Sequence, residues 1–193
     1  MTVTSLAVAQ TADAATPANI DALRDLLPDF AKDIRLNLSA VIKQDPNSGL
    51  TLNQVHGIAL ASAYATKHPA IIAAVTGETA ATLSAEEINA AKAAAAVMAM
   101  NNVYYRFIHL AHDKELSQLP AGLRMNVIAS PGIDKVTFEL YSLAVSAING
   151  CGLCIESHAA AVQKHEVSKT GVQHCVRISA VVAAAAQALC IPA

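Results

Sequence analysis

Apolar residues recur along this chain at helical spacing, and patterns typical of β-strands are almost absent. Hydrophobic residues make up 54% of the chain, and much of this content is Ala. Ala has the highest helix propensity, and its small side chain lets helices pack closely. The sequence therefore predicts an all-α fold. Near the N-terminus we expect one apolar helical face, formed by Leu23, Leu26, Leu27, Phe30, Ile34 and Leu38.

The charge content argues against several classes of partner. Charged residues are 15% of the chain and the formal net charge is -2, so nothing electrostatic points to nucleic acid or acidic lipid. The longest Ala-rich runs, 93–100 and 178–186, are shorter than the ~20 residues of a bilayer span. Residues 1–19 lack the basic start of a secretory signal, and their composition predicts a flexible tail. The four Cys are not spread like a secreted disulfide framework, so we expect a cytoplasmic protein with one functional Cys pair.

Turn and cap signals divide residues 20–193 into helical units. Residues 45–49 (Asp-Pro-Asn-Ser-Gly) form a turn cluster. Ser84 with Glu87 predicts a capped helix start, and Asp134 predicts another after the break at 130–132.

The chain also aligns with itself at an offset of 84 residues, which places Ser62 on Ser146. We interpret this as an internal repeat, at about 50–110 and 133–193, whose second unit alone keeps the chemistry. The alternative is that two Ala-rich segments align by chance. In this register, Cys151 falls on Lys67, Cys154 on Ala70, His158 on Ala74 and Glu139 on Val55.

Cys151, Cys154 and His158 form the most informative motif of the chain. Residues at i+3 and i+4 share a helix face, so two thiols and an imidazole would lie together. Asn149-Gly150 predicts a break just before them, which would place Cys151 in the first turn of a helix, where the macrodipole favours a thiolate. The spacing allows a Cys151–Cys154 disulfide, and His158 can take the Cys154 proton.

Glu139 lies in an otherwise apolar helical stretch, where a carboxylate is costly to bury without a partner. If the chain folds back at Asn149-Gly150, Glu139 comes level with His158. A Glu–His–Cys proton relay follows as a hypothesis. The alternatives are an exposed Glu139, or a carboxylate paired with Lys135.

Other chemistries have weaker support. A zinc site usually has four ligands, and no second ligand pair matches the Cys pair. A thioredoxin-like site needs a preceding strand, which is missing. We expect Cys175 and Cys190 to be buried structural thiols. Tyr104, Tyr105 and Arg106 could line a pocket, although packing or an interface is the simpler interpretation. The remaining histidines are interpreted as surface or satisfied core residues: His56, His68, His109, His112, His165 and His174.

These residues resemble a known family. Phe138-Glu139-Leu140, then Ser146 to Cys151, Cys154 and His158, are similar to the alkylhydroperoxidase D (AhpD) family, within the carboxymuconolactone decarboxylase-like superfamily. The resemblance extends to residues 26–38, 100–106 and 122–128, and covers the chain from about Ile20 onward. The combination of the Glu, the Cys pair and the His is far more specific than the Cys pair alone.

The resemblance implies an all-α duplicated fold, assembled as a homotrimer, that reduces organic hydroperoxides to alcohols. Cys154 would be the peroxidatic thiol, oxidised to a sulfenic acid, and Cys151, the more exposed thiol, would resolve it and form the disulfide with partners. Glu139 and His158 would relay the proton. Electrons would come from dihydrolipoyl groups on an acyltransferase, reduced by a lipoamide dehydrogenase, and the protein would also reduce a peroxiredoxin. No bound cofactor or metal is implied.

Some family members carry a His just before the second Cys, where this chain has Leu153. If that His assists the relay, peroxidase rates would be lower here. Two other functions stay open. A lactone decarboxylase of the same superfamily would leave both thiols unexplained, and a redox-sensing helical module would form a stable disulfide without peroxide turnover.

Overall fold

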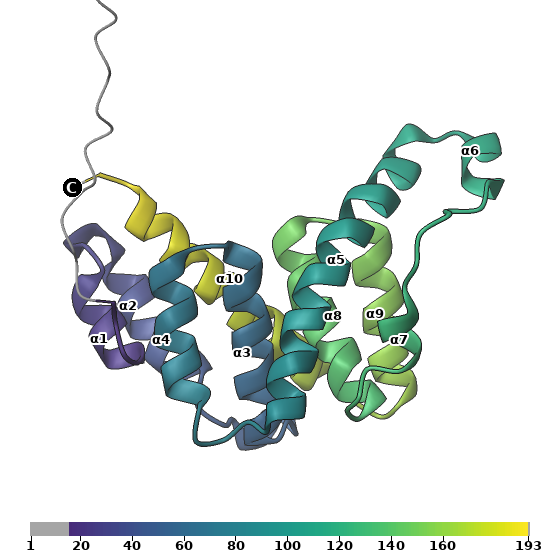
Figure 1. Cartoon of the computed structure of the whole chain (residues 1–193). Coiled ribbons are helices and arrows are strands. Elements are labelled where there is room, and N and C mark those ends of the chain that lie inside the picture. The colour runs from purple at the N-terminus through teal and green to yellow at the C-terminus, as the bar shows by residue number, and fades with distance from the viewer. Residues whose placement is uncertain (1–15, 193) are drawn as a thin grey trace, which may run out of the picture.

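The computed structural model describes residues 16–192, which form ten α-helices, two short 3-10 helices and no β-strand (Figure 1). The predicted all-α fold is confirmed. Residues 1–15 of the predicted tail lie outside the described part, and Asn19 already caps the first helix. The elements are α1 (Ile20–Leu26), η1 (Asp29–Ala31), α2 (Lys32–Val41), η2 (Pro46–Ser48), α3 (Leu52–Thr66), α4 (Pro69–Thr79), α5 (Ala85–Ala111), α6 (Lys114–Gln118), α7 (Asn126–Ala129), α8 (Lys135–Asn149), α9 (Gly152–Lys164) and α10 (Lys169–Cys190).

The predicted helix starts are confirmed. Ser84 and Glu87 form a reciprocal capping box at the start of α5. The Asp134 carboxylate accepts the Thr137 N–H at 2.9 Å and caps α8. The turn cluster at 45–49 folds as η2 and ends at Gly49 in the left-handed conformation.

The single apolar face predicted near the N-terminus is wrong in part. Pro28 and the extended backbone of Leu27 end α1, so the segment folds as α1 and α2 at different orientations. Leu23, Leu27 and Leu38 are buried, whereas Phe30 is 60% exposed. The prediction treated residues 23–38 as one helix, and Pro28 interrupts that helix.

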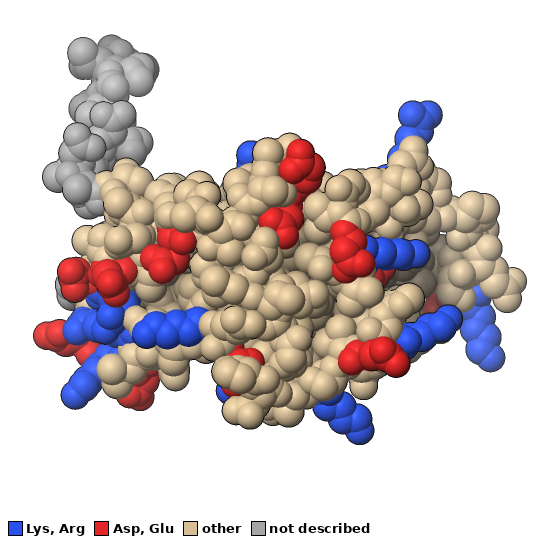
Figure 2. All heavy atoms as spheres, turned by 90° about the horizontal axis from the view of Figure 1, so that it is seen from below, with Lys and Arg blue, Asp and Glu red and all other residues tan. Residues whose placement is uncertain are grey.

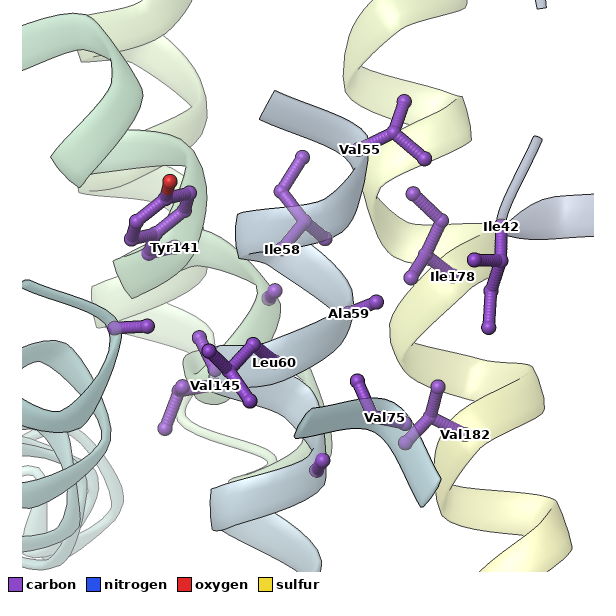
Figure 3. Packing of buried hydrophobic residues seen from close by; sticks show 14 of the residues in the cluster. Ile42, Val55, Ile58, Ala59, Leu60, Val75, Tyr141, Val145, Ile178 and Val182 are labelled. Atoms are coloured by element: carbon purple, nitrogen blue, oxygen red, sulfur yellow. The ribbon is translucent and has the colours of Figure 1, made fainter. Parts of the chain in front are cut away.

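The core lies between α3, α8 and α10, whose buried side chains interdigitate (Figure 3). Residues 55–63 of α3 are buried without interruption, so this helix is covered on all sides. Gly57 permits a close approach of α3 and α8, since a Cβ added there would lie 1.8 Å from the Tyr141 hydroxyl oxygen. The aromatic ring of α8 therefore occupies the space that a side chain on α3 would need.

Helix α10 is the one helix in the described part that is long and apolar enough to span a membrane by length and composition. Half of its apolar window is buried against neighbouring helices. A core helix of a water-soluble protein passes the same test, so this finding is weak support for a membrane span.

Two sets of three helices follow one another in the same order, α3–α4–α5 and α8–α9–α10. Their boundaries shift the register of the predicted repeat by one residue over α3 and α4. His68 caps α4 and Cys151 caps α9, so Cys151 corresponds to His68 rather than to Lys67. Ser84 and Ser168, which cap α5 and α10, keep the predicted register. The duplication itself stays a prediction.

The C-terminal part of α5 extends beyond the rest of the domain, with α6 at its far end (Figure 1). Val103, Phe107 and Leu110 on this segment are more than half exposed. Figure 2 shows one face on which acidic and basic side chains are mixed at the periphery, around a largely uncharged centre.

Candidate active site

The corner between α8 and α9 forms where the sequence predicts a break. Gly150 ends α8 in the left-handed conformation, with φ 68 and ψ 36. Its N–H bonds to the Ala147 carbonyl, and the Cys151 N–H bonds to the Ser146 carbonyl at 3.2 Å. The chain therefore turns within two residues, which brings the start of α9 back beside α8.

Cys151 is the N-cap of α9, one position before the first turn in which it was expected. Its sulfur accepts the Cys154 N–H at 3.3 Å and forms a disulfide with Cys154, with the two Cα atoms 5.3 Å apart. The predicted pairing is thus present. Both sulfurs lie at the positive end of α9, where a thiolate of the reduced form would be stabilised.

The expectation that Cys151 is the more exposed thiol is wrong for this disulfide form. Cys151 is 0% exposed and Cys154 is 6% exposed. The cap position lies on the inner side of the corner against α8, whereas Cys154 faces a cavity. The two residues between them, Gly152 and Leu153, are exposed.

Glu139 and His158 form a buried pair between α8 and α9. The Glu139 carboxylate lies 2.6 Å from Nδ1 of His158, and both residues are more than nine-tenths buried. The predicted alignment of Glu139 with His158 is confirmed, and the alternatives of an exposed Glu139 or a pair with Lys135 are wrong. The carboxylate accepts the Nδ1–H, which leaves Nε2 as the nitrogen that can exchange a proton.

Nε2 of His158 faces Met98 of α5, at 3.3 Å from the thioether sulfur. Among the described residues, no hydrogen bond joins His158 to Cys154 while the disulfide is closed. The transfer of a proton between these two side chains therefore stays a prediction, to be tested on the reduced form.

A cavity of about 390 Å³ brings these groups together. Its volume lies within the usual range for small-molecule sites. Cys154, Glu139 and His158 line it, whereas Cys151 does not. Most of the remaining wall is apolar, with a few polar groups; it consists of Met98, Asn101, Tyr105, Met125, Ile128, Leu153, Ser157 and Ala161.

The chain is similar in sequence to known proteins over most of its length. The chain is 54% identical to the alkyl hydroperoxide reductase AhpD of Coxiella burnetii (strain Dugway 5J108-111), over 85% of this chain and 93% of the relative. It is 53% identical to AhpD of Maricaulis maris (strain MCS10), over 89% and 97%. Residues 114–190 also match the Carboxymuconolactone decarboxylase family.

The chain belongs to the AhpD family. The resemblance expected from the Glu139, Cys151, Cys154 and His158 pattern is therefore confirmed at the level of the family. The roles of these residues in this AhpD-family chain stay predictions.

A hydrogen-bond network fixes the active corner of this AhpD-family chain against α5. Arg106 donates to the Asn149 carbonyl at 2.6 Å, and the Asn149 amide donates to the Asn102 side chain at 2.9 Å. Asn102 in turn donates to the Ser146 hydroxyl at 2.9 Å. Because the Ser146 carbonyl also accepts the Cys151 N–H, this network from α5 positions the backbone of the first disulfide cysteine.

Sequence reasoning missed the contribution of α5 to the cavity, apart from the suggestion that Tyr105 could line a pocket. Met98, Asn101 and Tyr105 all lie on its wall. Their spacing of three and four residues places them on one helix face, which the sequence could have shown. It could not show that this face meets His158, which lies 60 residues away along the chain.

The other thiols and histidines lie outside the cavity. Cys175 is buried as predicted, donates to the Leu140 carbonyl at 3.3 Å, and burial raises the pKa of its thiol. Cys190 is exposed, so the prediction of a buried thiol is wrong there, because it ends α10 at the domain surface. His56 and His174 are buried, and burial lowers the pKa of both imidazoles.

A second cavity, of about 500 Å³, lies on another face of α5. Lys67, Lys92 and Arg106 line it, and no cysteine does. The smaller cavity is the candidate site because it alone joins a thiol to the buried Glu–His pair. Within residues 16–192, no cluster of three His, Cys, Asp or Glu side chains is arranged to hold a metal ion.

Proposed function

We propose that this chain reduces alkyl hydroperoxides to alcohols, with Cys154 as the peroxidatic thiol. The observation that carries the proposal is the shared cavity of Cys154 and the buried Glu139–His158 pair. The relatives whose name is alkyl hydroperoxide reductase AhpD support the same reaction class. The apolar wall suits the organic part of such a substrate.

The reaction balances through the two cysteines. The Cys154 thiolate attacks the terminal peroxide oxygen, the O–O bond breaks, and the alkoxide takes up a proton to leave as the alcohol. The resulting sulfenic acid condenses with the Cys151 thiol, which releases water and forms the disulfide. Cys151 suits this second role because its sulfur already lies against Cys154 and outside the substrate cavity.

In this proposal, His158 carries the proton and Glu139 holds the imidazole of His158 in place. The Glu139 carboxylate fixes the tautomer and stabilises the imidazolium that forms when His158 takes the Cys154 proton. Nε2 then returns the proton to the leaving alkoxide. Leu153 cannot take part in this transfer, and so Nε2 of His158 must act alone or through solvent.

We propose a dihydrolipoyl group on an acyltransferase, itself reduced by lipoamide dehydrogenase, as the electron donor, and a peroxiredoxin as a second partner. A Cβ added to Gly152 would meet no atom within 4 Å, so the backbone between the two cysteines faces open space, from which a dithiol could approach. Since Cys151 is fully buried, its attack by a partner requires the first turn of α9 to move. The enzyme itself needs no bound cofactor.

We also propose a cytoplasmic homotrimer. The exposed apolar side chains on the extended part of α5 support an association between subunits. Light scattering of the purified chain, beside Phe107→Asp, tests it. A trimer that this substitution dissociates supports the proposal, and a monomer in both samples contradicts it.

The decisive experiment is peroxide-dependent NADH oxidation with purified lipoamide dehydrogenase, a lipoyl protein and this chain. Wild type is compared with Cys154→Ser, and with Cys190→Ser as the matched control at an exposed thiol. We expect turnover in wild type and in Cys190→Ser, and none in Cys154→Ser. Turnover that survives in Cys154→Ser would overturn the role of this thiol.

The alternative functions give different results in the same experiment. A redox-sensing module would form the Cys151–Cys154 disulfide with peroxide but show no turnover. A lactone decarboxylase, which the Carboxymuconolactone decarboxylase family match leaves in view, would act on a lactone substrate without either thiol. Lactone decarboxylation in the double variant Cys151→Ser/Cys154→Ser would favour that function.

A further inference from the structure

Among the described residues, Met98 and Glu139 are the side chains that lie within hydrogen-bonding distance of the His158 ring nitrogens, and the proposed reaction does not use Met98. Its side chain is 1% exposed, yet it lines the cavity that contains Cys154. Its sulfur lies 3.3 Å from Nε2 of His158. A hydroperoxide that enters the cavity to reach Cys154 is therefore also next to the thioether of Met98, which lines the cavity together with that of Met125.

We propose that Met98 is a site of oxidation by the substrate itself, and that its sulfoxide slows the enzyme by immobilising His158. This inference rests on the proposed function, because the hydroperoxide is brought into the cavity as the substrate of Cys154. A thioether reacts slowly with peroxides in solution, but binding in the cavity holds the two reactants together.

The step balances without any further reagent. A lone pair of the Met98 sulfur attacks the terminal peroxide oxygen, the O–O bond breaks and an S–O bond forms. The proton of that hydroxyl group passes to the leaving alkoxide, and Nε2 of His158 is close enough to carry it. The sulfur is oxidised by two electrons, and the hydroperoxide is reduced to the alcohol.

The consequence follows from hydrogen bonding at His158. A thioether is a weak acceptor, whereas a sulfoxide oxygen is a strong one. With Nδ1 already held by the Glu139 carboxylate, the sulfoxide would hold Nε2–H as well. The imidazolium would then have an acceptor at both nitrogens and would no longer return its proton to the alkoxide.

Met100 provides a matched control on the same helix. It lies two residues from Met98, is more exposed, and faces a different surface, beside Arg124, Asn126 and Val127. Oxidation that follows solvent exposure would reach Met100 first. Oxidation that follows substrate binding would reach Met98 first.

The test is peptide mass spectrometry after incubation of the reduced chain with cumene hydroperoxide and no electron donor. We expect Met98 to gain one oxygen more than about tenfold faster than Met100 in the folded chain, and at the same rate in urea. Oxidation of Met100 first, or of both at equal rates in the folded chain, overturns the proposal.

Activity completes the test. After the same exposure, we expect wild type and Met100→Leu to lose turnover that methionine sulfoxide reductase restores. Over-oxidised cysteine is not restored by that enzyme, so the recovered fraction reports on methionine alone. Met98→Leu, compared with its own untreated activity, should show no recoverable loss. A recoverable loss of equal size in Met98→Leu overturns the regulatory role.

Cys154→Ser separates this inference from the proposed function. Selective Met98 oxidation in that variant, with no turnover in untreated wild type, would reject the peroxidase and keep the modification site. Turnover in wild type without selective Met98 oxidation in either protein would keep the peroxidase and reject the modification site.

Discussion

The α3–α4 corner and the α8–α9 corner have the same backbone design and different contents. Each follows a helix of 15 residues that ends in a left-handed residue, Lys67 with φ 61 in one case and Gly150 with φ 68 in the other. In each, the next residue caps the following helix: His68 for α4 and Cys151 for α9. The shape of the corner therefore does not decide which of them carries chemistry.

The difference lies in the side chains that follow the cap. Aligned by their caps, Ile71 and Val75 of α4 take the places of Cys154 and His158, and both are fully buried in the core. α4 packs against α1, α3 and α10, whereas α9 packs against α5, α8 and α10. The side chains that follow the first cap pack into the core, whereas those that follow the second cap line the cavity shared with α5.

The comparison teaches that, under the proposed function, neighbouring helices rather than the shape of the corner make the α8–α9 corner reactive. A thiol pair on α4 would have no buried carboxylate beside it, because His56 of α3 takes the place that Glu139 has on α8 in the cap alignment. In the proposed function, the α8–α9 corner uses the carboxylate from the preceding helix and the cavity wall from α5. The four predictions below test separate parts of this contrast.

The largest effect is expected from the pair that only the second corner has. Glu139→Gln or His158→Gln should slow hydroperoxide turnover by about a hundredfold, because general acid–base catalysis contributes about that much or more. The coupled NADH assay measures it, with helix content followed by circular dichroism. His165→Gln, at the exposed end of α9, should keep full activity. Full activity in either active-site variant would refute the relay.

The next largest effect is a loss of stability when the contact between α3 and α8 is disturbed. Gly57→Ala would place a Cβ 1.8 Å from the Tyr141 hydroxyl oxygen, so the variant should lose about 1–3 kcal/mol of the free energy of unfolding. Urea denaturation checks this. Gly152→Ala is the control, since a Cβ there meets no atom within 4 Å. Equal stability of the two variants would show that α3 and α8 can separate without cost.

Exchange of the left-handed residues sharpens the comparison of the corners themselves. Gly150→Ala should destabilise the fold by about 1 kcal/mol, because only the backbone conformation opposes it. Lys67→Gly should stabilise it by less than about 1 kcal/mol, since glycine adopts positive φ freely. Urea midpoints measured side by side test both signs. Destabilisation by Lys67→Gly would mean that contacts of the lysine side chain stabilise the fold by more than its positive φ destabilises it.

The smallest effect is a dependence of stability on pH from histidines outside the active corner. Burial lowers the pKa of His56 and His174, with Arg177 adding to the effect at His174, and with Glu78 at His56 and Asp45 at His174 opposing it. The unfolded chain therefore binds protons that the folded chain does not, and stability should fall as the pH drops below about 6.5.

Urea midpoints between about pH 7.5 and about pH 5.5 measure this loss. His174→Gln should flatten the profile, whereas His109→Gln, on an exposed part of α5, should leave it unchanged. An unchanged slope in His174→Gln would show that its imidazole is protonated equally in both states.

Much of the site could be predicted from local sequence. The capped starts at Ser84 and Asp134, the break at Gly150 and the pairing of Cys151 with Cys154 all depend on residues a few positions apart. The meeting of Glu139 and His158 also followed, because a short corner makes positions on the two helices level. The prediction of one apolar face failed because it overlooked a local signal, the proline that divides α1 from η1 and α2.

By itself, the sequence determined the helices, their caps and the set of reactive groups, because helical spacing and backbone capping act over three or four residues. Tertiary structure alone decided that Cys151 is buried, that Cys190 is exposed and that Met98 faces His158. These outcomes depend on which helix faces pack together across the chain. Because this packing depends on side chains from the whole core, no local sequence pattern predicts it.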